Sequence, residues 1–487
     1  MVGLRRDSIF ALRLLPVAAL ASCGDDVRIA PDVPDAPSGY AHRNFLKASN
    51  SHADIGFGGS VALSHDGSVA AIAAMHEDSI ASGIDGDQSY WLADDSGAVY
   101  VFDRTATSWT QGAYIKAFES DPYDSFGMSL GLSSDGSVLV VGAPGDDSGR
   151  IDDEWDNSAA ESGAAFVFER TSSGWTEQAV LKAPQPTAGV ELGWNVAISG
   201  DGSTIAVASA ISGNTGEVHL FTRSSDGWMF AATVRASNAE RDDLFGWSVA
   251  LSGDGSTLAV GAIGEKGGNS GINGDASDNS IPLAGAVYVF TRTDDAWSQT
   301  AYVKSLAPEQ SELFGIRIAL SSDGSVLAVA ADGDSSGATG VNGDPRDTSA
   351  PVSGAAYVVR RTGSEWSHEA YIKASHPREF DLFGLGLALS PHGETLAVGA
   401  PGEAGFSGAV HVFERTADSW VPRAHVEGSP RYAAESFGDN LALSAKGETL
   451  LVGSPGESSS AVGVDNERSD GSAPDSGAVY VLQKSAP

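Results

Sequence analysis

The stretch Phe245–Ser305 decides the fold. It begins FGWSVALSGDGSTLAVGAIGE and, after an acidic insert, ends AGAVYVFTRTDDAWSQTAYVKS. Two apolar, β-branched runs flank Gly253-Asp254-Gly255, and an Asp-Gly pair is typical of a tight hairpin turn. A third run, AVYVFTR, alternates in polarity, and a fourth runs from Trp297 to Lys304 after a polar turn. The stretch therefore predicts four short strands in an antiparallel meander.

The same unit recurs seven times along the chain. Its opening Phe-Gly pair, or Leu-Gly in the third copy, returns every 53 to 69 residues, so that copies start near residues 57, 126, 192, 245, 314, 383 and 437. One such unit cannot bury both of its faces, so seven copies predict a fold in which each copy packs on its neighbours. Radial packing leaves only short, protected sheet edges. We therefore expect an all-β fold, a seven-bladed β-propeller of four-stranded antiparallel blades.

The ends of the repeat region predict how the ring closes. The seventh copy ends after its third strand, Gly477–Leu482, and no fourth strand with a tryptophan follows. Residues 40–49, YAHRNFLKAS, align with WTQGAYIKAF at 109–118, so that Tyr40 takes the place of Trp109. We expect residues 40–49 to supply the outer strand of the last blade, and residues 40–487 to form one propeller domain.

The first 39 residues predict export and anchoring. Residues 1–22 have the arginines, apolar stretch and small residues of a lipoprotein-type signal peptide. Leu20-Ala21-Ser22-Cys23 resembles the bacterial lipobox, and Cys23 is the only cysteine of the chain, which predicts lipidation there; an ordinary cleaved signal peptide is the alternative. Residues 23–39, rich in Pro and Asp, predict a disordered tether after the lipidated cysteine. We expect a bacterial cell-envelope protein, an outer-membrane or surface lipoprotein that contacts the membrane through its lipid anchor only.

The charge of the chain restricts its partners. Its formal net charge is −35, from 64 acidic and 29 basic residues. Such a surface repels nucleic acid and anionic lipid, which excludes nucleic acid as a partner. Long inserts fall between the second and third strands of copies 1, 2, 4, 5 and 7, whereas copies 3 and 6 have short turns there. These loops share one face of a propeller with the acidic connections between blades, so we expect one elaborated, negative face.

The inserts share a pattern of oxygen-bearing side chains. In copies 4, 5 and 7 these side chains occupy relative positions 1, 3 and 6, and copies 1 and 2 keep two of the three. The candidate metal ligands are Asp85, Asp87, Asp153, Asp156, Asn273, Asp275, Asp278, Asn342, Asp344, Asp347, Asp465, Glu467 and Asp470. Carboxylate and amide oxygens in a loop suit Ca²⁺, which takes six to eight oxygen ligands. The alternative is that they build Asx-turns in soluble loops without metal. No cofactor other than Ca²⁺ is indicated.

Two tryptophans stand apart from the others. Six open the fourth strands, where equivalent positions predict packing between blades, but Trp91 and Trp155 lie in acidic inserts. Exposed aromatic side chains in such loops favour contact with a partner. Trp91 and Trp155 are therefore candidate partner-binding residues.

Several short motifs carry a family resemblance. Phe-Gly at the start of each copy, Gly-Ala-Pro-Gly at Gly142–Gly145 and Gly399–Gly402, and the Ser-Gly-Ala-Val-x-Val-Phe that follows are similar to the FG-GAP repeats of integrin α-subunit propellers and their bacterial relatives. The resemblance implies a β-propeller over essentially the whole mature chain. Family calcium sites lie between strands 1 and 2 in an Asp-x-Asp-x-Asp-Gly type sequence. Here that loop is only Ser-x-Asp-Gly-Ser, as at Asp135 and Asp254, so the family's sites do not carry over.

No catalytic constellation stands out. The ten histidines are scattered without helical metal-ligand spacing, and no serine lies on a strand–turn–helix elbow. We therefore expect a non-catalytic, lipid-anchored envelope or surface protein with a monomeric domain. Its acidic, loop-bearing face would bind a protein or carbohydrate partner, with Ca²⁺ as a candidate requirement. Because propellers also host hydrolases and lyases near the axis, the alternative is an extracellular hydrolase or lyase with its active site in an axial funnel.

Overall fold

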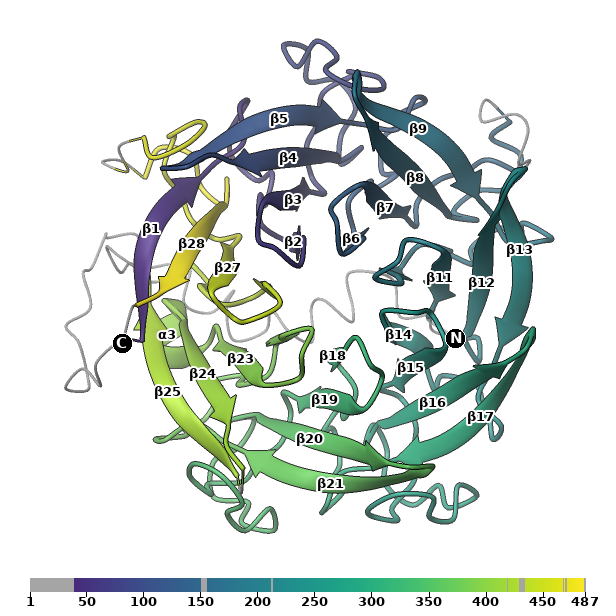
Figure 1. Ribbon diagram of the computed structural model, residues 1–487, viewed down its shortest axis with the longest axis vertical. Helices are drawn as coiled ribbons and strands as arrows, with labels where there is room; N and C mark the ends of the chain where they lie inside the picture. Colours follow the sequence, from purple (N-terminus) through teal and green to yellow (C-terminus); the bar gives the residue numbers. More distant parts are fainter. Residues whose placement is uncertain are drawn as a thin grey trace.

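The chain folds as a ring of β-sheets. The computed structural model describes residues 39–149, 156–211, 213–417, 419–428, 434–466, 468 and 471–485. Within these ranges, 28 strands form seven four-stranded antiparallel sheets arranged around a common axis (Figure 1). The helix described among them is the single turn α3 (Glu403–Phe406). The predicted seven-bladed, all-β propeller is confirmed.

Each blade runs from a short inner strand to a long outer strand (Figure 1). The first three blades consist of β2 (Ser60–Leu63), β3 (Val69–Ala74), β4 (Ala98–Arg104) and β5 (Trp109–Ile115); β6 (Ser129–Leu132), β7 (Val138–Ala143), β8 (Ala164–Thr171) and β9 (Gly174–Leu181); and β10 (Asn195–Ile198), β11 (Thr204–Ser209), β12 (Glu217–Ser224) and β13 (Gly227–Val234). The next three consist of β14 (Phe245–Leu251), β15 (Thr257–Ala262), β16 (Ala286–Thr293) and β17 (Ala296–Val303); β18 (Ile318–Leu320), β19 (Val326–Ala331), β20 (Ala355–Thr362) and β21 (Glu365–Ile372); and β22 (Gly386–Leu389), β23 (Thr395–Ala400), β24 (Ala409–Arg415) and β25 (Trp420–Glu427).

The seventh blade combines strands from both ends of the described chain. It contains β26 (Leu441–Leu443), β27 (Thr449–Ser454), β28 (Ala478–Lys484) and, outermost, β1 (Tyr40–Leu46). β1 pairs antiparallel with β28, with Tyr40 opposite Lys484 and Leu46 opposite Val479. The Tyr40 side chain is buried, and its hydroxyl donates to the carbonyl oxygen of Gly447. Tyr40 thus packs in the core at the start of an outer strand, where other blades have tryptophan.

The second strand of every blade is buried along its whole length. β15, with the sequence TLAVGA, is one example. Because neighbouring blades cover both faces of a blade, its middle strands need no polar face and form continuous runs of Val, Ala, Leu and Gly. The polar residues are left to the outer strands and the loops.

The Phe-Gly pair joins each blade to the one before it. The amide of Phe57 donates to the carbonyl of Ser476 at 3.2 Å, which links the first copy to the last. Gly58 has a φ of +96°, and a Cβ there would lie 2.6 Å from the carbonyl oxygen of Ala478, so glycine alone fits. The Phe57 ring stays in its own blade, edge-on to Tyr100 at a centroid distance of 5.3 Å. The motif therefore builds the joints of the ring.

The turns between first and second strands meet around the axis. The amide of His65 donates to the Ser134 carbonyl at 2.9 Å, and the amide of Ala445 donates to the His65 carbonyl at 2.8 Å. Equivalent backbone hydrogen bonds join the other turns, except at Pro391, which has no N–H to donate. The turns therefore form a hydrogen-bonded ring on the face opposite the inserts.

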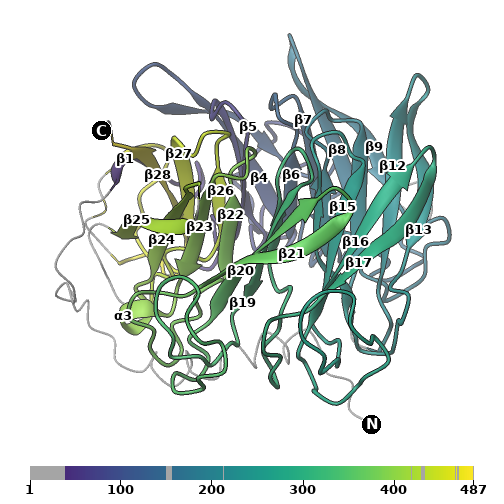
Figure 2. The same cartoon turned by 60° about the horizontal axis from the view of Figure 1, so that its bottom comes forward.

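The inserts occupy one face of the propeller. The long loops between β15 and β16 and between β19 and β20 extend to the same side, and α3 lies on that side too (Figure 2). No helix among the described residues is long and apolar enough to cross a membrane. The predicted elaborated face is therefore real, and α3 lies in the short turn of the sixth blade, one of the two blades without an insert.

Candidate functional site

A buried lysine anchors the insert in each of the five blades that carry one. The lysine directly follows the outer strand, and its ammonium pairs with a carboxylate at the start of the insert. The Nζ–oxygen distances are 2.8 Å for Lys116–Glu77, 2.5 Å for Lys182–Asp146, 2.7 Å for Lys304–Glu265, 2.9 Å for Lys373–Asp334 and 2.7 Å for Lys47–Glu457.

The same ammonium also reaches the far end of the insert. Lys116 Nζ donates to the Ser96 hydroxyl at 2.7 Å, and Lys304 Nζ donates to the Gly285 carbonyl at 2.6 Å. Burial lowers the pKa of Lys304, and the carboxylate of Glu265 opposes that shift. Each lysine therefore ties both ends of an insert to its blade.

A second buried carboxylate lies two residues before the Phe-Gly pair in five copies. These residues are Asp124, Asp243, Glu312, Asp381 and Glu435. Burial raises the pKa of Asp124 and of Glu312 to about 8, with Asp146 and Asp334 respectively as further negative charges nearby. Lys266 lies 3.0 Å from Asp243, and Arg468 lies 3.0 Å from Glu435. Asp243 and Glu435 thus each have a cation from the insert of their own blade. Asp124 and Glu312 instead lie beside another acid.

The first position of the insert pattern caps the outer strands. Asp85, Asn273, Asn342 and Asp465 all have positive φ, and their side-chain oxygens accept a strand N–H at 2.8 to 3.0 Å. At Asn342, the Oδ1 accepts from the Tyr371 amide at 3.0 Å, and the Asn342 amide donates to the Tyr371 carbonyl at 2.7 Å. Val341 also bridges to Ile372. The insert is therefore fixed to the outer edge of the blade by an isolated β-bridge and these hydrogen bonds.

The third and sixth positions form local turns. Asp87, Asp275, Asp344, Asp278 and Asp347 each accept the backbone N–H two residues further on, at 2.9 to 3.0 Å. Asp156 accepts from the hydroxyl of Ser158 at 2.9 Å. Asp153, Glu467 and Asp470 lie outside the described residues. These are the hydrogen bonds that the turn interpretation expects, and calcium binding by the inserts stays a prediction.

Trp91 lies on the surface of the first insert. Its side chain is 51% exposed, its indole N–H donates to the Gln88 carbonyl at 3.1 Å, and its ring stacks on His52 at a centroid distance of 4.3 Å. Trp91 bridges to Ser79 across the insert. Trp155, the other predicted partner-binding residue, lies outside the described residues. The structure therefore presents Trp91 on a hydrogen-bonded hairpin.

Further exposed apolar side chains belong to the same insert as Trp91 or to the connection beside it. Among the described residues, ten large hydrophobic side chains are exposed, and six of them belong to the first insert or to the connection beside it. These six, the first-insert patch, are Ile80, Tyr90, Trp91, Leu92, Phe118 and Tyr123. The two segments are joined by hydrogen bonds, including one of 2.8 Å from the Tyr123 amide to the Asp94 carbonyl. Contiguous exposed apolar surface is more typical of interaction sites than of the rest of a soluble protein's surface.

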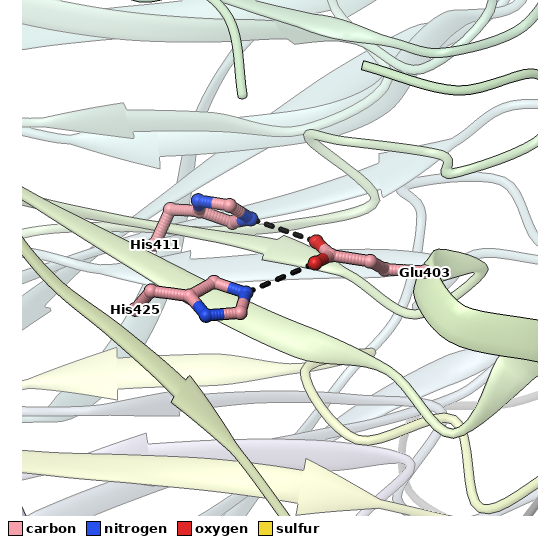
Figure 3. A group of neighbouring side chains, drawn as sticks. All are labelled: Glu403, His411 and His425. Atoms are coloured by element: carbon pink, nitrogen blue, oxygen red, sulfur yellow. Dashed lines mark hydrogen bonds and ion pairs between the residues drawn. The ribbon is translucent and has the colours of Figure 1, made fainter. Parts of the chain in front are cut away.

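Blade 6 holds a cluster that the sequence pattern did not reveal. Glu403 on α3 faces His411 on β24 and His425 on β25, and both imidazoles point at its carboxylate (Figure 3). His411 Nε2 lies 2.8 Å from Glu403 Oε2, and His425 Nε2 lies 3.0 Å from Oε1. Burial opposes ionisation, but the hydrogen bonds from both histidines hold the pKa of Glu403 well below its usual range. Among the described residues, these three side chains alone bring three His, Cys, Asp or Glu ligand atoms within 4.8 Å of one another.

The signal for this cluster was present in the alignment of the copies. His411 and His425 occupy the positions that Tyr288 and Tyr302 have in blade 4. Glu427 occupies the position that Lys304 has there. Scattered histidines have no helical spacing because two adjacent strands, rather than one helix, bring them together. A comparison of the copies position by position would have found them.

Comparison with known proteins places the repeats in a family. The FG-GAP repeat model matches residues 109–168 and 228–290. No curated protein sequence matches the chain. Similar solved structures include a chain of the Mitotic Checkpoint Complex, with 14% identity over 95% of this chain and 97% of that one and a TM-score of 0.48. Hydrazine Synthase from Kuenenia stuttgartiensis has 14% identity, coverages of 83% and 93%, and a TM-score of 0.47. A protein from Lactobacillus plantarum has 16% identity, coverages of 73% and 84%, and a TM-score of 0.44.

Each matched segment runs from the outer strand of one blade to the third strand of the next. In this chain each match therefore spans the joint between two blades, where Phe-Gly lies, rather than one blade. The likeness to the solved structures is too distant to carry an argument about activity. The chain is a seven-bladed β-propeller that carries FG-GAP repeats in two places.

Proposed function

We propose that the protein is a non-catalytic binding module that engages a protein partner through the first-insert patch. The observation that carries the proposal is the concentration of exposed apolar side chains on one insert and the connection beside it, in a chain with a net charge of −35. A solvent-facing insert needs no such side chains for its own folding, and exposed Trp and Tyr are enriched where partners bind.

The charge around the patch indicates the chemistry of the partner. Asp85, Asp87 and Asp94 are exposed in the same insert. An apolar centre with an acidic rim is complementary to an apolar surface bordered by Lys and Arg. We therefore propose a protein partner whose apolar surface is bordered by basic residues. The experiment must distinguish such a protein from a carbohydrate that stacks on Trp91.

The first insert is held in place before any partner arrives. The buried ion pair between Lys116 and Glu77 holds the base of the insert. Further along the insert, Asp85 accepts a hydrogen bond of 2.9 Å from the Tyr114 amide of the outer strand. Because a preorganised loop loses little conformational entropy on binding, it supports affinity better than a loose loop does. The anchoring lysines thus serve the proposed function indirectly, by fixing the patch.

The propeller would act at the bacterial envelope, anchored through Cys23. The lipobox-like sequence and the acidic tether composition support this part of the proposal. Metabolic labelling with a palmitate analogue should modify the wild-type protein, and Cys23→Ser should abolish the label. An unlabelled wild-type protein would contradict the anchor but leave the binding proposal intact.

Site-specific crosslinking tests the binding proposal. A photo-crosslinking amino acid at position 90 should give a discrete adduct on intact envelopes, and Trp91→Ala in the same protein should remove it. The control carries the crosslinker at position 230, because Phe230 is 45% exposed on β13, outside the patch. Equal adducts from both positions would contradict a specific site. Binding to a glycan array that Trp91→Ala removes, without a protein adduct, would assign the patch to a carbohydrate.

A further inference from the structure

Blade 6 departs from the charge pattern of the blades that carry inserts. Glu403 follows Gly402 at the end of the second strand, as Glu265 follows Gly264 in blade 4. In blade 4 the ammonium of Lys304 neutralises Glu265, but the equivalent residue in blade 6 is Glu427. The half-buried carboxylate of Glu403 therefore has no lysine at the position that supplies one elsewhere.

Two imidazoles take the place of two phenols beside this carboxylate. His411 and His425 are direct cross-strand partners, with ring centroids 4.6 Å apart. In blade 4, the corresponding Tyr302 hydroxyl donates to Glu265 Oε1 at 2.7 Å. In blade 6 each oxygen of Glu403 faces one Nε2 instead. The carboxylate is thus kept from blade 4, while both tyrosines are replaced by histidines that direct a ring nitrogen at it.

The geometry is close to that of a transition-metal site. Two imidazole nitrogens and one carboxylate are the protein ligands of many zinc sites that keep a fourth position open. Ligand atoms about 2.0–2.1 Å from a tetrahedral ion are separated by roughly 3.3 Å. The present nitrogen–oxygen distances of 2.8 and 3.0 Å, one to each oxygen of Glu403, are a few tenths of an ångström shorter than that separation, and the ligand atoms all lie within 4.8 Å of one another.

The surroundings favour a cation and permit its entry. Asp381, also buried, is a further negative charge near Glu403. His411 is held by edge-on packing against Phe383 at 5.3 Å, whereas the His425 side chain is 27% exposed. The turn between β23 and β24 is short, and it carries α3 on the insert-bearing face (Figure 2). The cluster therefore combines a fixed ligand and a reachable ligand with a second carboxylate nearby.

We propose that blade 6 binds one divalent transition-metal ion of the zinc class through Glu403, His411 and His425. The ion takes the role that the buried lysine has in the five blades that carry inserts. It joins the turn after β23 to the two outer strands, and it leaves a coordination position open towards the insert-bearing face. The site is independent of the first-insert patch.

Metal titration of the purified mature chain tests the proposal. After treatment with a chelator and dialysis, the protein should bind one equivalent of Zn²⁺, measured by calorimetry. Co²⁺ should give the visible absorption of a tetrahedral site, which a surface-bound ion does not give. Zn²⁺ should also raise the melting temperature, because it binds the folded state.

Matched variants assign the ligands. His425→Gln and Glu403→Gln should each weaken Zn²⁺ binding at least tenfold, whereas His392→Gln, on an exposed turn of the opposite face, should not change it. A triple variant, His411→Tyr, His425→Tyr and Glu427→Lys, rebuilds the blade-4 arrangement and should fold without binding metal. Absence of stoichiometric binding by the wild-type protein, or binding that survives both ligand variants, would overturn the proposal.

Discussion

The ammonium of Lys304 lies 2.7 Å from the carboxylate of Glu265, and each side chain is only 1% exposed. The pair sits where the outer strand of blade 4 ends and its insert begins. Because four other blades repeat it, the pair is part of how an insert is attached to this propeller. Its strength can be measured by removing one partner.

Lys304→Met should destabilise the protein by about 3–5 kcal/mol, because it leaves Glu265 buried without its counter-charge. Lys304→Met combined with Glu265→Leu should recover part of that loss. Arg235→Met is the control: Arg235 holds the same position in blade 3, which has no insert, and its side chain is 56% exposed, so a change of at most about 1 kcal/mol is expected. Urea denaturation measures all three. If Lys304→Met left the free energy of unfolding unchanged, the pair would not be an anchor.

Stability should fall as the pH rises from about 4.5 to about 8, in part because of Glu312. Burial raises the pKa of Glu312 from 4.5 to about 8. Below this window the carboxyl is protonated in both states, whereas within it only the unfolded state loses the proton, which favours unfolding. Glu312→Gln should therefore flatten the pH dependence of the unfolding free energy, by an amount on the order of a few kcal/mol at pH 9.

Asp243→Asn provides the comparison for that measurement. Asp243 has Lys266 at 3.0 Å, so its replacement removes an ion pair as well as a buried charge. We expect a smaller gain or a loss of stability at high pH. Identical pH profiles for Glu312→Gln and the wild type would show that Glu312 titrates normally.

Asn342→Ala should loosen the outer edge of blade 5. The substitution removes the hydrogen bond to the Tyr371 amide and places alanine at a φ of +58°. Together these changes should cost about 2 kcal/mol. Hydrogen exchange at Tyr371 should become faster. Asn342→Gly keeps the backbone conformation but loses the side-chain bond, so it should show the faster exchange with a smaller loss of stability.

Millimolar Ca²⁺ should raise the melting temperature if the insert oxygens bind it, and Mg²⁺ should do so less, because Mg²⁺ demands a tighter octahedral site. The comparison variant is Asp275→Ser with Asp278→Ser, which removes two predicted ligands from one insert. A melting temperature that does not respond to Ca²⁺ would reject the calcium hypothesis and leave the turn interpretation.

The sequence was sufficient for the fold because its signals are local and repeated. Phe-Gly, the Asp-Gly turns and the alternating strands each specify a short segment, and their recurrence specifies the ring. The oxygen pattern of the inserts predicted that these residues share a role, but spacing does not say where a side chain points. The Asn342 oxygen points to the Tyr371 amide, about 29 positions away in sequence.

The buried lysines and the blade-6 cluster were harder to predict for a different reason. A lysine such as Lys304 is rarely fully buried, so its burial follows only once its partner Glu265 is known. Glu403, His411 and His425 belong to a turn and two strands whose register the sequence does not state. The substitution of Glu427 for lysine was the visible sign that the local charges differ there.

The pairing of β1 with β28 has a mechanical consequence. Any pull on the chain ahead of Tyr40 reaches the ring at the first residue of an outer edge strand. Among the described strands β1 pairs with β28, so such a force would load the Tyr40 end of this pairing first, whereas the hydrogen bonds between Phe45 and Asp465 hold the other end of β1 to the seventh insert. The buried Tyr40 ring and its hydroxyl contact with Gly447 stand at the start of that path, so they act as the first latch against unzipping.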